Sequence, residues 1–199
     1  MNKTICVYSS SSCAIDKKYF EAAEALGKEI ALRGDILLYG AGYVGLMGAT
    51  AISVHKHGGK VIGIIPKALN QKGIVYEACD ELIITEGMRE RKALMDEKSD
   101  AFIALPGGYG TLEELLEIIT LKQLKYHNKP IVILNLYNFY GNLFNQFELI
   151  INERFAKPEC SSLYHITDSI SGALEYIDSY KPVEIGQKWL TDVNRNGEF

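Results

Sequence analysis

The stretch AFIALPGGYGTLEELLEIITLKQLKY, residues 101–126, decides the fold. It opens with five apolar residues in a row, which is typical of a strand buried on both faces of a parallel sheet. A turn with three glycines follows, and from Leu112 onward the apolar residues recur at helical spacing. A buried strand, a tight turn and a helix in this order form the repeating unit of a parallel α/β sheet.

The same unit repeats on both sides of this stretch. Short apolar runs predict strands at 5–8, 36–39, 61–65, 82–84, 101–105, 131–134 and 163–166. Helical periodicity predicts helices at 16–33, 46–57, 88–98, 112–126, 140–154 and 169–180. We therefore expect an α/β fold, a single-domain, doubly wound (Rossmann-like) parallel sheet flanked by helices on both faces. Residues 1–180 would form one nucleotide-binding domain, and the polar stretch 181–199 a loosely held tail.

The bulk composition limits the partners and the compartment. The chain has 199 residues and a formal net charge of −4, whereas nucleic-acid binding normally needs a basic face. The apolar runs fall short of the roughly 18–20 residues needed to span a bilayer, and the N-terminus does not read as a secretory leader. The four cysteines are scattered and lack metal-ligand spacing. We expect a cytoplasmic protein that binds no nucleic acid, membrane or metal.

Chemically unusual turns follow four of the predicted strands. In a parallel sheet these turns share the carboxyl edge, where ligands bind. The turns read SSSS at 9–12, GAGYVGLMG at 40–48, MRERK at 88–92 and PGGYGTLEE at 106–114. Hydroxyls, glycines, cations and carboxylates are therefore expected along one rim of the sheet.

The turn at 106–111 predicts a phosphate-binding site. Gly107, Gly108 and Gly110 would let backbone N–H groups approach a ligand, and the next helix would add its positive N-terminal end. Thr111 could add a hydroxyl. The alternative is a tight turn closed by a capping box, since Thr111 and Glu114 have that spacing. Capping does not require three glycines, so we favour phosphate binding.

The turn at 40–48 matches G-x-G-x-x-G, the dinucleotide-binding fingerprint. It follows the second strand rather than the first, however, and the next strand, VIGIIPK, lacks the acid that would bind the ribose of NAD. A Walker loop is also excluded, because Leu46 and Met47 stand where Lys and Ser or Thr are needed. The motif predicts a turn whose backbone approaches a ligand, rather than an NAD site.

Cations and carboxylates complete the predicted rim. One helix face carries, at the spacing i, i+3, i+4 and i+7, Met88, Arg91, Lys92 and Met95. An anionic or polar ligand explains cations on this face better than snorkelling side chains do. Glu113 and Glu114 lie in the first turn of the helix after the glycines, and the helical wheel does not decide between them. A carboxylate beside a phosphate-anchored ribose suits hydrolysis of a glycosidic bond.

The segment PGGYGTLEE, preceded by Met88-x-x-Arg91-Lys92, resembles the paired signature of the Lonely Guy (LOG) family. These proteins are cytokinin riboside 5′-monophosphate phosphoribohydrolases that are often mislabelled as lysine decarboxylases. The resemblance runs from about residue 5 to about residue 155 and includes the second-strand turn. It implies hydrolysis of nucleoside 5′-monophosphates, AMP or N6-prenylated AMP, to the free base and ribose 5-phosphate. It also implies a homodimer with the site near the interface, and no cofactor.

The family motif assigns a role to each matching residue. Arg91 and Glu114 would form the catalytic pair. The 5′-phosphate would be held by Gly107, Gly108, Gly110 and Thr111. The pocket for base and ribose would be lined by Met88, Lys92 and Glu113, and in the same pocket we place Gly42, Ser10 and Thr120.

Two departures from the family pattern bear on the ligand. Ala41 replaces the middle glycine of the second-strand turn, which predicts slight crowding of the ligand. Where many plant members have an acidic residue after the third strand, this chain reads QKG at 71–73, which leaves the preference for cytokinins open. The alternatives are a non-catalytic nucleotide-binding or sensing module and an NAD(P)-dependent oxidoreductase. A pyridoxal-phosphate lysine decarboxylase does not fit, because no lysine stands in a pyridoxal-binding setting.

Overall fold

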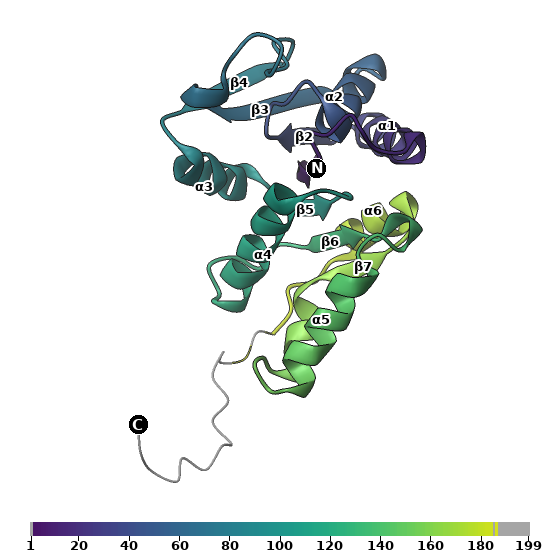
Figure 1. The fold of residues 1–199 in the computed structure, drawn as a ribbon, viewed down its shortest axis with the longest axis vertical. Helices are drawn as coiled ribbons and strands as arrows, with labels where there is room; N and C mark the ends of the chain where they lie inside the picture. Colours follow the sequence, from purple (N-terminus) through teal and green to yellow (C-terminus); the bar gives the residue numbers. More distant parts are fainter. Residues whose placement is uncertain (1, 185, 187–199) are drawn as a thin grey trace.

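The computed structural model describes residues 2–184 and 186, and within them all seven predicted strands are present. The strands are β1 (Thr4–Tyr8), β2 (Ile36–Tyr39), β3 (Lys60–Pro66), β4 (Glu81–Thr85), β5 (Ala101–Ala104), β6 (Ile131–Leu134) and β7 (His165–Thr167). They form one sheet in the order β4-β3-β2-β1-β5-β6-β7 (Figure 1). Every neighbouring pair is parallel, as the uninterrupted apolar runs predicted.

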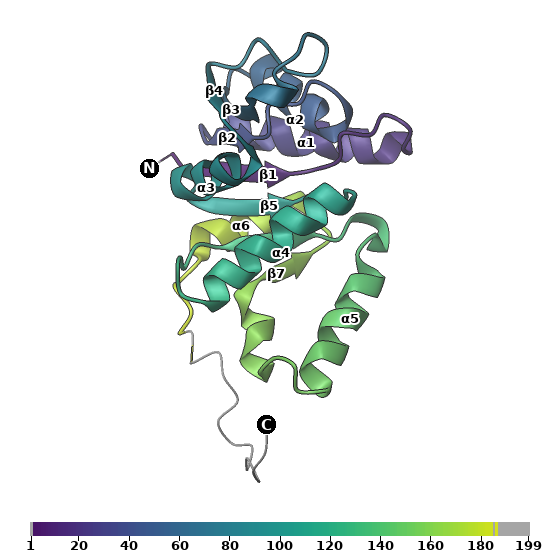
Figure 2. The ribbon, with the colours of Figure 1, turned by 60° about the vertical axis from the view of Figure 1, so that its left-hand side comes forward.

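Six α-helices accompany these strands in the described part of the chain, five of them between strands and α6 after β7. They are α1 (Lys17–Leu32), α2 (Gly45–Lys56), α3 (Met88–Lys98), α4 (Tyr109–Gln123), α5 (Gly141–Asn152) and α6 (Ile170–Ser179). Three short 3-10 helices join them, η1 (Lys67–Leu69), η2 (Leu136–Asn138) and η3 (Pro158–Leu163). The α/β class and the helices on both faces are confirmed (Figures 1 and 2).

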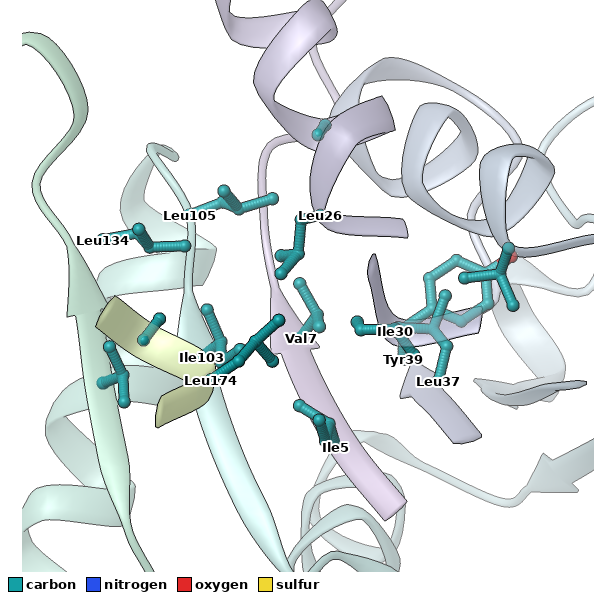
Figure 3. Close-up of a cluster of buried hydrophobic side chains, with 14 of the residues drawn as sticks. Ile5, Val7, Leu26, Ile30, Leu37, Tyr39, Ile103, Leu105, Leu134 and Leu174 are labelled. Atoms are coloured by element: carbon teal, nitrogen blue, oxygen red, sulfur yellow. The ribbon is translucent and has the colours of Figure 1, made fainter. Parts of the chain in front are cut away.

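The alternation of side chains along the strands produces two cores. Ile5, Val7, Leu37 and Ile103 point to the face covered by α1, α2 and α6. Figure 3 shows this cluster, closed by Leu26 and Ile30 of α1 and Leu174 of α6. The intervening strand residues, such as Cys6, Tyr8 and Phe102, face α3, α4 and α5. Because both faces are covered, the strands need apolar residues at every position.

Two elements, α4 and β7, have bounds that differ from the predicted ones. Helix α4 begins at Tyr109 rather than at Leu112, because Gly108 takes the N-cap position, and it ends before Lys125, whose φ of 67° breaks the helix. The last strand lies at His165–Thr167 rather than at 163–166, since the residues up to Leu163 form a 3-10 helix that starts at Pro158. The predicted tail falls largely outside the described residues, although the Val183 carbonyl accepts a hydrogen bond from Asn128.

The order of the strands fixes where a ligand can bind. The chain winds outward from β1 through β2 and β3 to β4, and then returns to β5 on the other side of β1. The loops after β1 and β5 therefore diverge at the carboxyl edge, and these two strands lie side by side at the centre of the sheet (Figure 2). This topological switch point is where doubly wound proteins bind their ligands. Within the described residues, every helix is too short or too polar to span a bilayer.

Candidate active site

A cavity of about 730 Å³ lies at this switch point. Ligand pockets usually measure about 300–1,000 Å³, so a nucleotide fits in this volume. The loops after β1, β2, β3 and β5 and the start of α3 all contribute to its wall. Of the residues that the sequence predicted for the site, the cavity is lined by Ser10, Gly42, Met88, Arg91, Gly108, Gly110, Thr111 and Glu114. Four separate turns thus meet as the topology predicted.

Arg91 and Glu114 form a buried ion pair in the wall of the cavity. The guanidinium Nη1 donates to Glu114 Oε1 at 2.7 Å, although the two residues come from different helices, α3 and α4. The same guanidinium donates from Nε to the carbonyl of Ile64 on β3 at 3.1 Å. Arg91 is only 6% exposed, so the pair is held by the fold and shielded from water. Of the two carboxylates that the helical wheel left open, Glu114 faces Arg91 and the cavity, whereas Glu113 contacts Lys92.

Gly40 makes the position of Arg91 sterically accessible. A Cβ atom at residue 40 would lie 2.1 Å from Arg91 Nη2 and 2.8 Å from Met47 Cε. The absence of a side chain at Gly40 therefore leaves room for the Arg91 guanidinium. The local sequence does not indicate this role, because Arg91 lies far away along the chain. The guanidinium fills the space that a side chain at the end of β2 would occupy.

Burial raises the pKa of Glu114 above its usual 4.5, and the charge and hydrogen bond of Arg91 work in the opposite direction. Burial has the larger effect, so the carboxyl holds its proton to a higher pH than an exposed glutamate does. A buried carboxyl with a raised pKa next to a fixed cation is suited to general acid–base chemistry.

The glycines of the 106–111 turn serve two different purposes. A Cβ at Gly107 would lie 2.1 Å from Thr111 Oγ1, so this glycine leaves room for the threonine side chain. A Cβ at Gly108 or Gly110 would meet no atom of the described chain within 4 Å. Gly108 has an ordinary φ of −87°, so its backbone conformation does not demand glycine either. Both positions border the cavity, where the missing side chains leave the backbone open to a ligand.

Helix α4 begins at this open backbone. Gly108 is its N-cap, and no side chain caps the helix. The capping-box alternative was therefore wrong, because Thr111 lies inside the helix and Glu114 is committed to Arg91. The N–H groups of a first helical turn have no acceptor within the helix, and the dipole adds positive potential there. The first turn of α4 therefore presents unpaired N–H groups and positive potential to the cavity, a combination that favours an anion.

Four predicted site residues do not line the cavity of the single chain. Gly107 is turned toward Thr111. Lys92 lies on the side of α3 next to Arg91 and forms ion pairs with Glu113 and Glu117 of α4. Thr120 lies nine residues beyond Thr111, about 13 Å further along the helix at 1.5 Å per residue. It lines a groove between α4 and α5 and donates to the Leu116 carbonyl at 2.7 Å. Any role of these four in binding stays a prediction.

The turn at 40–48 is shaped by internal packing. Gly45 has a φ of +64°, and a Cβ there would lie 2.6 Å from the Ser10 carbonyl oxygen. A Cβ at Gly48 would lie 1.8 Å from the carbonyl oxygen of Tyr43. Of the three glycines in the apparent dinucleotide fingerprint, Gly40 and Gly45 are thus explained by contacts within the chain, whereas a Cβ at Gly42 would meet only the Met47 side chain, and Gly42 lines the cavity.

The expected crowding by Ala41 was wrong. Its side chain is fully buried and packs with Ile65 and Val75, away from the cavity. Its left-handed φ of 58° turns the Cβ away from the ligand side. The methyl group therefore takes no space from a ligand.

One wall of the cavity consists of residues that no sequence motif marks. Val44, Leu69 and Ile74 supply apolar surface from the turn after β2 and from the long loop after β3. This loop is held against the turn by hydrogen bonds from Tyr43 N to the Ile74 carbonyl and from Tyr76 N to the Ala41 carbonyl, both 2.8 Å. Tyr8, at the end of β1, lines the cavity floor. Loop residues without a motif leave no periodic signal, so only their position in space identifies them.

The fold and the cavity at the β1/β5 switch point place the chain in the class of Rossmann-like α/β proteins. Solved structures agree. The molybdenum cofactor carrier protein of Chlamydomonas reinhardtii has a TM-score of 0.68 at 24% identity, with 89% of this chain and 97% of that chain covered. The molybdenum cofactor binding protein of Rippkaea orientalis has a TM-score of 0.69 at 28% identity, covering 90% and 97%.

Sequence comparisons define the family. Residues 47–177 match the family model described as "Possible lysine decarboxylase". The chain is 41% identical to the cytokinin riboside 5′-monophosphate phosphoribohydrolase LOG5 of Arabidopsis thaliana, over 92% of this chain and 81% of that protein. It is also 41% identical to the enzyme LOG of Oryza sativa subsp. japonica, over 94% and 78%. The chain belongs to the LOG family, as the paired motifs predicted.

Proposed function

We propose that the chain hydrolyses the N-glycosidic bond of nucleoside 5′-monophosphates and releases the free base and ribose 5-phosphate. The observation that carries this proposal is the pair Gly108 and Gly110. At both positions the backbone at the start of an uncapped helix is open to a cavity. The buried pair of Arg91 and Glu114 lies in the same cavity. An anion site next to a buried carboxylate suits a phosphorylated substrate that reacts at its sugar.

In this reaction the 5′-phosphate binds at the N-terminus of α4 and so fixes the ribose, which makes positioning the main contribution of binding energy. Glu114 acts at the anomeric carbon. It takes a proton from the attacking water as the C1′–O bond forms and the C1′–N bond breaks. The electron pair of the broken bond goes to the base nitrogen. The proton that Glu114 took from the water then passes to the base, so that Glu114 returns to its ionised form. Arg91 holds the carboxylate in place through its 2.7 Å hydrogen bond and balances its charge. The proposed reaction uses no metal and no organic cofactor.

The base would occupy the apolar end of the cavity, against Val44, Leu69, Ile74 and Met88. A purine presents a flat apolar face to such a wall. The plant relatives are named for cytokinin riboside 5′-monophosphates. We therefore propose AMP or N6-prenylated AMP as the substrate, with activation of a cytokinin in the second case.

We further propose a cytoplasmic homodimer with the site near its interface. Large apolar and aromatic side chains stand exposed on and around α4 and α5, with Tyr109 92%, Tyr126 76% and Phe155 85% exposed. Tyr109 also lines the cavity, so a second chain packed over it would border the site. All four cysteines are free thiols, which fits a reducing compartment. Sedimentation velocity would give the mass of the particle in solution.

Chromatography of the products tests the reaction. Purified protein is incubated with AMP and, separately, with N6-isopentenyl-AMP, beside the variants Glu114→Gln and Glu117→Gln. We expect free base and ribose 5-phosphate from the wild type and from Glu117→Gln, whose side chain contacts Lys92 outside the cavity. Glu114→Gln should release no base. Nucleotides that bind and remain intact in every reaction would leave a nucleotide-binding module in place of an enzyme.

A further inference from the structure

Tyr140 lies below the turn that opens the anion site and takes no direct part in lining the cavity. It precedes α5, is 3% exposed, and its ring packs edge-on against Phe139 with a centroid distance of 4.9 Å. The proposed reaction gives this tyrosine no role. Its hydroxyl, however, is a polar group inside an apolar core, and such a group needs partners.

The partners of the hydroxyl flank Pro106. The Tyr140 O–H donates to the carbonyl of Leu105 at 2.7 Å. On the other side of the proline, the backbone N–H of Gly107 interacts with the phenol oxygen and lowers the pKa of Tyr140. Burial has the larger effect and raises the pKa well above 10, so the phenol keeps its proton and remains a donor. One side chain thus ties together the residues before and after the turn's proline.

Gly107 connects this contact to the anion site. Its N–H faces Tyr140 rather than the cavity, and its missing side chain leaves the space for Thr111. Thr111 lies in the first turn of α4 and lines the cavity. The phenol thus contacts the turn on both sides of Pro106, and Gly107 lies directly against Thr111 in the first turn of the helix.

Tyr140 is itself held by a strained turn. Tyr137 and Asn138 in η2 have φ values of 54° and 58°, a left-handed conformation that is uncommon for residues other than glycine. Asn135 ties the turn together, because its Oδ1 accepts from Tyr140 N at 2.8 Å and its own N–H donates to the Thr167 carbonyl at 2.8 Å. Strained backbone of this kind persists where the surroundings determine it, and it often accompanies function.

We infer that Tyr140 is a positioning residue for the phosphate-binding turn and acts through Gly107. The inference rests on the proposed function, since it takes the open N-terminus of α4 as the phosphate site. A group that orders this site improves binding of the phosphate in the ground state and the transition state alike. Its loss therefore raises KM and leaves kcat nearly unchanged.

The test compares Tyr140→Phe with Tyr180→Phe. The control also removes one tyrosine hydrogen bond, from Tyr180 Oη to Asn128 Oδ1 at 2.8 Å, on a side chain that does not border the cavity. KM and kcat are measured with AMP, and the dissociation constant of ribose 5-phosphate is measured by titration calorimetry. For Tyr140→Phe we expect KM and the dissociation constant to rise about five-fold, the equivalent of one hydrogen bond, with kcat unchanged. Tyr180→Phe should match the wild type in both measurements.

Unchanged KM and ribose 5-phosphate affinity in Tyr140→Phe would overturn the inference, and so would a fall in kcat with KM unchanged. If Tyr140→Phe does not fold, Asn135→Ala serves instead, since it keeps the phenol but removes the acceptor of the Tyr140 amide, and the same rise in KM is expected. A wild type that binds ribose 5-phosphate without cleaving AMP refutes the proposed function alone, because the calorimetric comparison still decides the role of Tyr140. A wild type that binds neither ligand refutes both.

Discussion

Replacing Gly108 with alanine should abolish tight substrate binding without harming the fold. The added Cβ meets no atom of the described chain within 4 Å, and the φ of −87° is ordinary for alanine. Alanine has less conformational entropy than glycine in the unfolded chain, and this difference stabilises the folded variant by about 0.4–1 kcal/mol. The poorer N-cap costs about 0.5–1 kcal/mol. The two effects nearly cancel, so the free energy of unfolding should stay within about 0.5 kcal/mol and Tm within about 2 °C.

The effect on binding should be far larger, because the methyl group occupies the place of the phosphate. Loss of one charge-assisted hydrogen bond costs about 1.5–3 kcal/mol, which corresponds to about 10- to 150-fold in kcat/KM for AMP. Gly87→Ala is the matched control. Gly87 is likewise the N-cap residue of a helix, α3, that no side chain caps. An added Cβ there would meet no atom of the described chain within 4 Å, and its φ of −154° is extended, but it does not line the cavity.

Steady-state kinetics with AMP and thermal melts of both variants decide the matter. We expect the two variants to have the same Tm within about 2 °C but to differ in kcat/KM for AMP. Equal kinetics for Gly108→Ala, Gly87→Ala and the wild type would show that the ligand does not approach this backbone. An equal loss of activity in both variants would trace the effect to the helix caps rather than to the phosphate.

Three further predictions concern buried charges. The acid limb of kcat/KM against pH should lie above 4.5, because the reaction needs ionised Glu114 and burial raises its pKa; a limb at or below 4.5 would contradict this role. Gly40→Ala should lower kcat/KM by about a hundred-fold, because its Cβ would displace the guanidinium of Arg91, and AMP kinetics would detect this. Lys122→Met should stabilise the protein at pH 7 by about 2 kcal/mol, because the Lys122 ammonium is buried without a hydrogen-bond partner in the described chain and burial lowers its pKa from 10.5 to about 8. The folded state binds the Lys122 proton more weakly than the unfolded state does. The free energy of unfolding of the wild type should therefore rise between about pH 8 and 10.5, whereas that of Lys122→Met should not. Urea unfolding at both pH values would show this difference.

The fold was predictable because its signals are local. Apolar runs without alternation mark strands covered on both faces, and they placed all seven strands in the right part of the chain. The start of α4 was harder to locate. Tyr109 and Gly110 are weak helix formers, and they are helical here because Gly108 caps the helix and the chain must turn back over the sheet. Tertiary context overrode local preference at this point.

The site was predictable to the extent that its residues lie in motifs. Arg91 and Glu114 came from two motifs whose turns the topology brings to one edge. Their 2.7 Å contact, and the choice of Glu114 over Glu113, depend on the angle at which α3 and α4 meet, which no local pattern encodes. The apolar wall formed by Leu69 and Ile74 was missed because it comes from the connection after β3, where the sequence has neither a motif nor a periodic pattern.

The glycines separate what the fold requires from what a ligand requires. At Gly40, Gly45 and Gly107 an added Cβ would lie 2.1–2.5 Å from the nearest atom of the chain itself, so packing within this molecule accounts for each of them. At Gly108 and Gly110 neither packing nor backbone conformation accounts for the residue. Glycine is an acceptable N-cap at Gly108, but alanine would also fit there, and alanine would be the better helix former at Gly110. We infer that both glycines keep the backbone open to a ligand, and the positive N-terminus of α4 favours an anion as that ligand.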